Sequence, residues 1–74
     1  ARLFKQETGY SLMGYVILLR INHAKLLLTE TEKSITDIAL ECGYTDFTYF
    51  SKQFKQLTGA NPSKFRKENK KIHN

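Results

Sequence analysis

Apolar residues recur along most of this chain at intervals of three and four positions, which is the spacing of one face of an α-helix. The longest such stretch follows Ser11, a residue suited to cap a helix, and predicts a helix that runs to about Leu28. Its expected core stripe is Leu12, Tyr15, Val16, Leu19, His23 and Leu27, widened by Ile21, Ala24 and Leu28. Ile17 and Leu18 extend the apolar surface most of the way around, so this helix needs packing partners on more than one side.

Two shorter helices separated by a tight turn are predicted between Ser34 and Thr58. Ser34 can cap the first of them, whose apolar face is Ile35, Ile38, Ala39 and Cys42. Gly43 follows as a residue that takes the left-handed conformation easily. Asp46 can cap the second helix, in which four apolar residues share a face, namely Phe47, Phe50, Phe54 and Leu57. Two helices joined by such a turn are the plan of a helix-turn-helix.

The segments on either side complete an all-α reading, because no strand-like pattern occurs. Gly59 ends the second helix of the pair, and Asn61 followed by Pro62 predicts a short closing helix to Lys67. Residues 68–74 form a charged tail with one apolar residue. Arg2–Thr8 has helical composition without a cap before it, which suggests a helix cut in its middle. The aromatic residues of the second half are expected in its core rather than on a base-stacking surface: Tyr44, Tyr49, Phe50, Phe54 and Phe65.

Charge is distributed unevenly along the 74 residues, which are enough for one small domain. The net charge is +5, but residues 1–46 carry a balance of −1 and residues 47–74 a balance of +6. The excess thus begins at the second helix of the predicted pair, which favours an anionic partner on that side. A solvated surface with a basic tail would give the same count.

Other functional classes find little support in the sequence. The single cysteine cannot form an internal disulfide, which fits a reducing cytoplasm, and Cys42 reads as a small core residue. No spacing of metal ligands and no nucleophile beside a base emerges, so we expect neither a metal, a cofactor nor an enzyme. The densest apolar run, Leu12–Ile21, contains Arg20 and is too short to span a membrane.

Three strings carry a resemblance to a known family: RLFKQETGYS, AKLLLTE, and SITDIALECGYTDFTYFSKQFKQLTGANPSKFRK. From Arg2 to Lys67 the chain resembles the DNA-binding domain of the AraC/XylS family of bacterial transcription regulators. The resemblance implies seven helices in two helix-turn-helix units joined by one linker helix. Residues 1–9 would then be the end of the first recognition helix, 10–29 the linker helix, and 34–67 the second, homeodomain-like unit with its closing helix. The helices before these would lie outside the chain.

The resemblance also implies which residues contact double-stranded DNA. The base-contact candidates are Phe47, Thr48, Ser51 and Lys52 in the second recognition helix, with Arg2 in the first. The backbone candidates are Lys55, Asn61, Ser63, Lys64, Arg66 and Lys67, together with the turn at Gly59. Activation of transcription by contact with RNA polymerase in the bacterial cytoplasm is implied as well.

Two positions depart from the family's pattern. Phe47 stands where polar residues such as Gln are common, so it either contacts a thymine methyl or packs against the turn. Ile17 and Leu18 stand where basic or polar residues are usual. The alternative hypothesis is therefore a helical interaction or dimerisation module that uses this apolar face of the linker helix.

Overall fold

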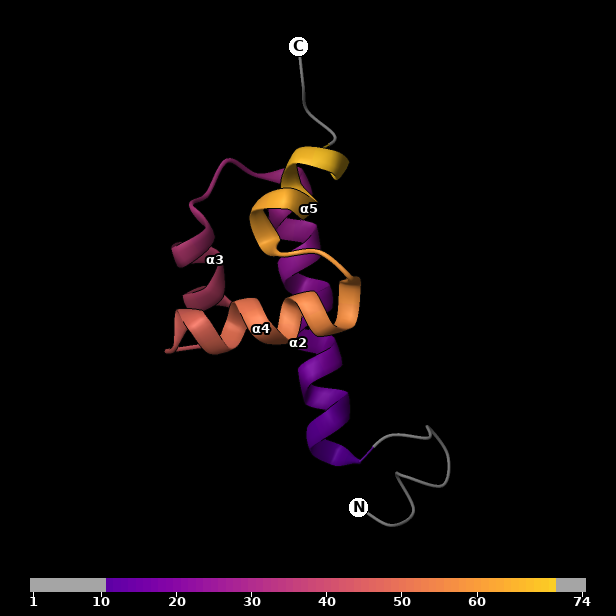
Figure 1. Ribbon diagram of the computed structural model, residues 1–74. Helices are drawn as coiled ribbons and strands as arrows, with labels where there is room; N and C mark the ends of the chain where they lie inside the picture. Colours follow the sequence, from indigo (N-terminus) through magenta and orange to yellow (C-terminus); the bar gives the residue numbers. More distant parts are fainter. Residues whose placement is uncertain (1–10, 71–74) are drawn as a thin grey trace.

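The computed structural model describes residues 11–70, and within that range the chain is entirely helical apart from its turns. The helices are α2 (Leu12–Glu30), α3 (Ile35–Glu41), α4 (Phe47–Thr58) and α5 (Pro62–Asn69). The long α2 forms the spine, α4 crosses it, and α3 and α5 lie near its C-terminal end (Figure 1). The predicted all-α class is confirmed.

Each helix begins at the capping residue that the sequence predicts. The side chains of Ser11, Ser34 and Asp46 accept hydrogen bonds from the backbone N–H three residues later, at 3.0, 3.0 and 3.2 Å. Asn61 does the same for α5 at 2.8 Å, with Pro62 directly after it. These contacts satisfy N–H groups that have no acceptor inside a helix, and so fix where each helix starts.

A single core joins the four helices. Ile21, Ala24 and Leu28 of α2 are almost completely buried, as are Phe50 and Phe54 of α4. The Phe50 and Phe54 rings lie 5.9 Å apart, and the ring of Phe65 from α5 meets Phe54 edge-on at 5.2 Å. Since aromatic pairs in these tilted and edge-on arrangements attract each other beyond simple burial, α4 is held between α2 and α5.

The predicted core stripe of α2 is wrong at three positions. Leu12 and Leu19 in the N-terminal half are 54% and 50% exposed, and His23 in the C-terminal half is exposed as well. The other described helices gather around the C-terminal half of α2, and its N-terminal half projects beyond them (Figure 1). Periodicity identifies an apolar face, but burial also requires an element to cover it.

Two further positions differ from the predicted core. Tyr49 was expected inside with the other aromatic residues but is 49% exposed, because it lies on the side of α4 that does not face the core. Leu57 shares the apolar face of α4 but is 52% exposed, at the end of the helix beside the projecting half of α2.

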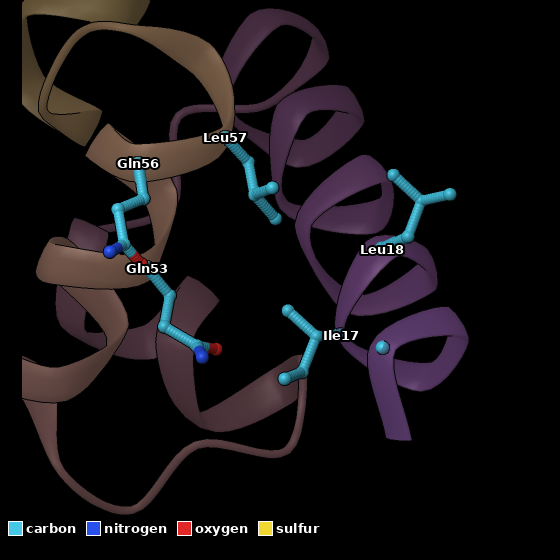
Figure 2. Close-up of a pocket in the computed structure, with 6 residues that line it drawn as sticks. Ile17, Leu18, Gln53, Gln56 and Leu57 are labelled. Carbon is cyan, nitrogen blue, oxygen red and sulfur yellow. The ribbon is translucent and has the colours of Figure 1, made fainter. Parts of the chain in front are cut away.

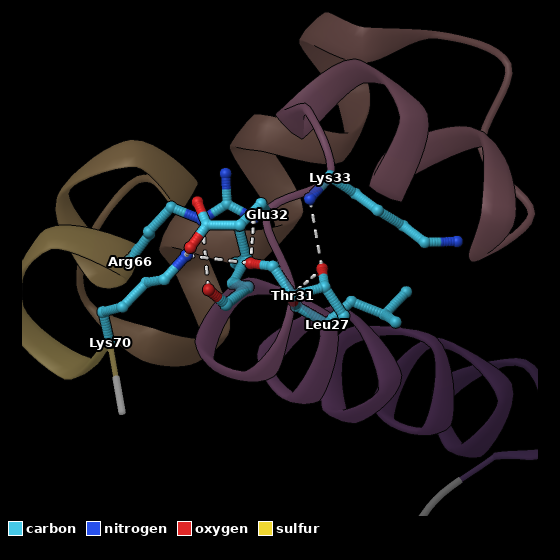
Figure 3. Close-up of polar contacts among 7 residues, drawn as sticks. Leu27, Thr31, Glu32, Lys33, Arg66 and Lys70 are labelled. Carbon is cyan, nitrogen blue, oxygen red and sulfur yellow. Dashed lines mark hydrogen bonds and ion pairs between the residues drawn. The ribbon is translucent and has the colours of Figure 1, made fainter. Parts of the chain in front are cut away.

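α5 is longer than predicted and is tied to the end of α2. Arg66 Nε donates to the Leu28 carbonyl at 3.0 Å, and Arg66 Nη2 donates to that of Thr31 at 3.2 Å. Lys70 Nζ donates to the same Thr31 oxygen at 3.0 Å and pairs with Glu32 at 2.7 Å (Figure 3). Carbonyls at a helix C-terminus lack intrahelical donors, so these cations act as its cap. The helix therefore continues through Asn69, into the segment predicted as a tail.

By length and composition, α2 as a whole would be able to cross a membrane, unlike the shorter run considered above. Core helices of globular proteins share this length and composition, and α2 packs against α3, α4 and α5. The predictions for Arg2, for the helix end in residues 1–9 and for positions 71–74 lie outside the described residues.

We expect the Cys42 thiol to react slowly while the chain is folded. The residue is 6% exposed, and burial raises the pKa of its thiol, so little thiolate is present at neutral pH. If opening costs about 3 kcal/mol, as in a small domain, an aromatic disulfide reagent should react about 100-fold faster in denaturant than in buffer. Equal rates would show that the core around α3 is not closed.

Candidate nucleic-acid interface

The turn between α3 and α4 is built around one glycine. Gly43 has φ of 95°, a left-handed conformation that side chains disfavour. The Gly43 and Tyr44 N–H groups donate to the carbonyls of Leu40 and Ala39 at 3.0 and 2.9 Å, which closes the end of α3. Asp46 then starts α4, so only a few residues separate the two helices.

An exposed polar ridge runs along the side of α4 that faces away from the core. Thr48 and Lys52 each stand two residues from a buried phenylalanine, which is about 200° around the helix. Gln56 continues the ridge one turn after Lys52, and Lys55 lies beside it; all four are exposed. A row of hydroxyl, amide and ammonium groups at this spacing presents the donors and acceptors that base edges and phosphates require.

The other two base-contact candidates lie at the edge of this ridge. Ser51 is partly buried, about 100° from both Phe50 and Lys52. Phe47 is 45% exposed, and its ring lies 6.3 Å from that of Phe50. Phe47 is therefore both a packing residue at the start of α4 and a partly open apolar surface.

The backbone candidates that follow α4 surround the start of α5. Gly59 is left-handed, with φ of 89°, and ends α4. Asn61, Ser63 and Lys64 are exposed there. Ser63 occupies the second position of α5, where the backbone N–H has no acceptor within the helix, and such groups bind phosphate well.

Arg66 has a different position from the other basic candidates. Its guanidinium is engaged with the α2 carbonyls described above, whereas Lys64 and Lys67 are exposed on α5. Arg66 therefore has a structural role that the sequence did not reveal, and we leave it out of the interface. Thr31 and Leu28 lie 35 and 38 positions away along the chain, so no local pattern signals these bonds.

Two exposed residues of α4 were missed. Gln56 follows Lys52 by four positions, and that helical spacing could have placed it on the ridge. Tyr49 could not be placed in the same way, since an aromatic residue among apolar ones reads as core. The described residues contain no cluster of three or more His, Cys, Asp or Glu side chains that could hold a metal ion.

The family model described as "Helix-turn-helix domain" matches residues 1–68 of this chain. The chain belongs to the AraC/XylS family. It is thus a DNA-binding helix-turn-helix module of transcription regulation, and the α3–turn–α4 segment has that geometry.

Similar proteins in the AraC/XylS family are named as activators. The chain is 42% identical over 67 residues to the HTH-type transcriptional activator RhaR of Klebsiella pneumoniae, which covers 90% of this chain and 24% of that protein. It is 43% identical over 65 residues to RhaR of Yersinia pseudotuberculosis, covering 88% and 22%. The chain therefore spans about a quarter of the length of these relatives.

Two solved structures share the fold. One is the C-terminal domain of the two-component response regulator YesN from Fusobacterium nucleatum, with a TM-score of 0.81 and 34% identity, covering 86% of this chain and 62% of that one. The other, from Listeria innocua, is described as having unknown function and gives a TM-score of 0.84 at 40% identity, covering 93% and 66%.

Replacing Arg66 and Lys55 by methionine should separate stability from DNA contact. Arg66→Met should lower the free energy of unfolding by about 1–3 kcal/mol, because the partly buried Leu28 carbonyl loses its charged donor and that of Thr31 keeps only Lys70. Lys55→Met should leave stability nearly unchanged but reduce the slope of log K against log salt by about 0.9, the value of one phosphate contact. Urea denaturation and salt-dependent binding measure the two effects. The reverse pattern would return Arg66 to the interface.

Proposed function

We propose that α4 reads base edges in the major groove of double-stranded DNA through Thr48 and Lys52. The observation that carries this proposal is the exposed ridge of α4, directly opposite the buried Phe50 and Phe54. A helix anchored by two core aromatic rings presents its other side to the surroundings of the domain. That is how the second helix of a helix-turn-helix enters the groove.

The chemistry of these side chains defines what they recognise. Lysine donates to guanine O6 and N7, and threonine can either donate or accept a hydrogen bond and can also contact a thymine methyl. Ser51, at the edge of the ridge, adds a second hydroxyl. Lysine lacks the two-pronged geometry of arginine, so these residues specify bases less strictly than an arginine would.

The phosphate backbone would be held on both sides of this reading surface. Lys55 extends from α4, and the start of α5 offers the Ser63 backbone N–H with Lys64 and Lys67 close by in the sequence. The positive balance of residues 47–74 supports such contacts. We assign Phe47 mainly to packing against Phe50, with its exposed edge available to a thymine methyl.

For the whole protein we propose a bacterial transcription activator that works in the cytoplasm and contacts RNA polymerase. This rests on membership of the family and on the activators to which the chain is similar. In that arrangement Arg2 belongs to a first reading unit. The linker helix would set the two recognition helices about 34 Å apart, which is one turn of DNA.

Lys52→Ala should weaken binding to a preferred duplex by about 1–3 kcal/mol, since a base contact of that size is lost. The preferred duplex is first obtained by selection from a randomised pool, and affinity is then measured by fluorescence anisotropy. Lys25→Ala removes the same charge from α2, outside the ridge of α4, and serves as the matched control.

The two variants together decide the proposal. Loss of preference in Lys52→Ala and its retention in Lys25→Ala support reading by α4. If both variants bind preferred and unrelated duplexes equally weakly, Lys52 contributes only to the overall positive charge and does not read a base.

A second function, self-association, is favoured by one observation. A groove of about 310 Å³ lies between α2 and the end of α4, and Ile17 and Leu57 extend into it (Figure 2). The neighbouring Leu12, Met13 and Leu19 are at least half exposed. An apolar surface of this kind is typical of an interface.

Leu18→Glu tests this second function. If the groove joins two copies, the charge should convert a dimer to a monomer in sedimentation experiments, because the carboxylate would be buried without a partner. Binding of the preferred duplex by α4 should persist, since Leu18 lies on α2. A wild-type chain that is monomeric at all concentrations would exclude the dimer.

A further inference from the structure

Arg20, for which the sequence suggested no role, packs against the turn of the helix-turn-helix. Its guanidinium carbon lies 5.5 Å from the centre of the Tyr44 ring, within the range of a cation–π contact. A β-carbon at Gly43 would lie 3.2 Å from Arg20 Nε and 3.3 Å from Cζ. The flat guanidinium thus covers both the glycine that makes the turn and the tyrosine after it.

Tyr44 connects Arg20 to α4, because it contacts Arg20 and also bonds to a residue of α4. The residue is 4% exposed, and its hydroxyl donates a hydrogen bond of 2.8 Å to Gln53 Oε1. Burial raises the pKa of the Tyr44 phenol, so the hydroxyl keeps the proton that it donates. Gln53 Nε2 in turn donates to the Tyr49 hydroxyl at 2.9 Å. Both ends of one amide are therefore engaged, on the flank of α4 next to the polar ridge.

These contacts restrict rotation of α4 about its own axis more closely than the core packing does. Phe50 and Phe54 anchor α4 through apolar packing, which has little directional preference. Hydrogen bonds and the stacked guanidinium do have directions. A side chain at a radius of about 5.5 Å moves about 2 Å when its helix rotates by about 20°, which is enough to break a hydrogen bond to a base.

We propose that Arg20 is a positioning residue for DNA reading, which acts through Tyr44 and Gln53 to set the rotation of α4 about its axis. The proposal rests on the proposed function of α4. Arg20 contacts the turn from the α2 side, so it would affect the base contacts of Thr48 and Lys52 without touching DNA.

The test compares the intact chain with Arg20→Lys, which keeps the charge but loses the flat stacking group. Gln53→Leu breaks the same connection at its α4 end and leaves Arg20 unchanged. Lys25→Gln on α2 is the control for a change of charge on the same helix. Affinity is measured for a selected duplex and for a scrambled duplex of equal length, at several salt concentrations.

Arg20→Lys and Gln53→Leu should each lower the ratio of the two affinities about 10-fold, the size of one lost base contact. The double variant should be little worse than either single one, because both break one connection. The affinity for the scrambled duplex and the salt slope should stay unchanged in Arg20→Lys. Lys25→Gln should keep the ratio.

Two results would overturn the proposal. If Arg20 only stabilises the fold, Arg20→Lys would weaken binding to both duplexes in proportion to the fraction of protein unfolded. The ratio of the two affinities would then stay the same. If Arg20 touched phosphate, its replacement by lysine would weaken binding to both duplexes equally and leave the ratio of the two affinities intact. If Arg20→Lys does not fold, the test rests on Gln53→Leu. An unchanged ratio of the two affinities in that variant would also overturn the proposal.

A DNA-free measurement separates this proposal from the proposed function. In NMR spectra, Arg20→Lys should shift the Tyr49 ring signals and the amides of Thr48 and Lys52. Shifts confined to α2 and the turn would show that Arg20 does not set α4. If the wild-type chain prefers neither duplex, the proposed reading by α4 fails, whatever these shifts show about Arg20 and helix orientation.

Discussion

The packing of two aromatic rings of α4 against α2 is the constraint on which the rest of this structure depends. Phe50 and Phe54 are fully buried and belong to the same core cluster as Ile21, Ala24 and Leu28 of α2. Because these rings stand one turn apart on one side of α4, they fix the opposite side as the exposed one. The core therefore determines both the stability of the domain and which side of α4 is exposed.

Local chemistry made much of this fold predictable. Ser34, Asp46 and Asn61 cap helices through bonds to residues three positions away, and Gly43 supplies a backbone conformation that its neighbours disfavour. Such interactions are complete within a few residues, so sequence patterns report them directly. The position of the ridge followed from the same reasoning, since Lys52 lies between two phenylalanines in the sequence and on the other side of the helix.

Interactions between distant segments were the ones that the sequence did not reveal. Arg66 looked like another cation of a basic surface, but the carbonyls that hold it belong to the end of α2. The Arg66 side chain suits either a solvent-exposed surface or a helix end, and only the path of the remote segment selects one. Prediction from periodicity fails where a residue is amphipathic and its partner is far along the chain.

The uneven burial of α2 follows from how many elements are present to cover it. Its C-terminal half lies against the other described helices and contributes the buried Ile21, Ala24 and Leu28, while Leu12 and Leu19 in the other half are at least half exposed. A helix that is apolar on most sides is stable in water only when further elements pack against it. The solved structures that share this fold are longer, since the chain covers 62% and 66% of them. Arg20 stands between the exposed and the buried half of α2, where its guanidinium lies against Gly43 and Tyr44 in the turn between α3 and α4.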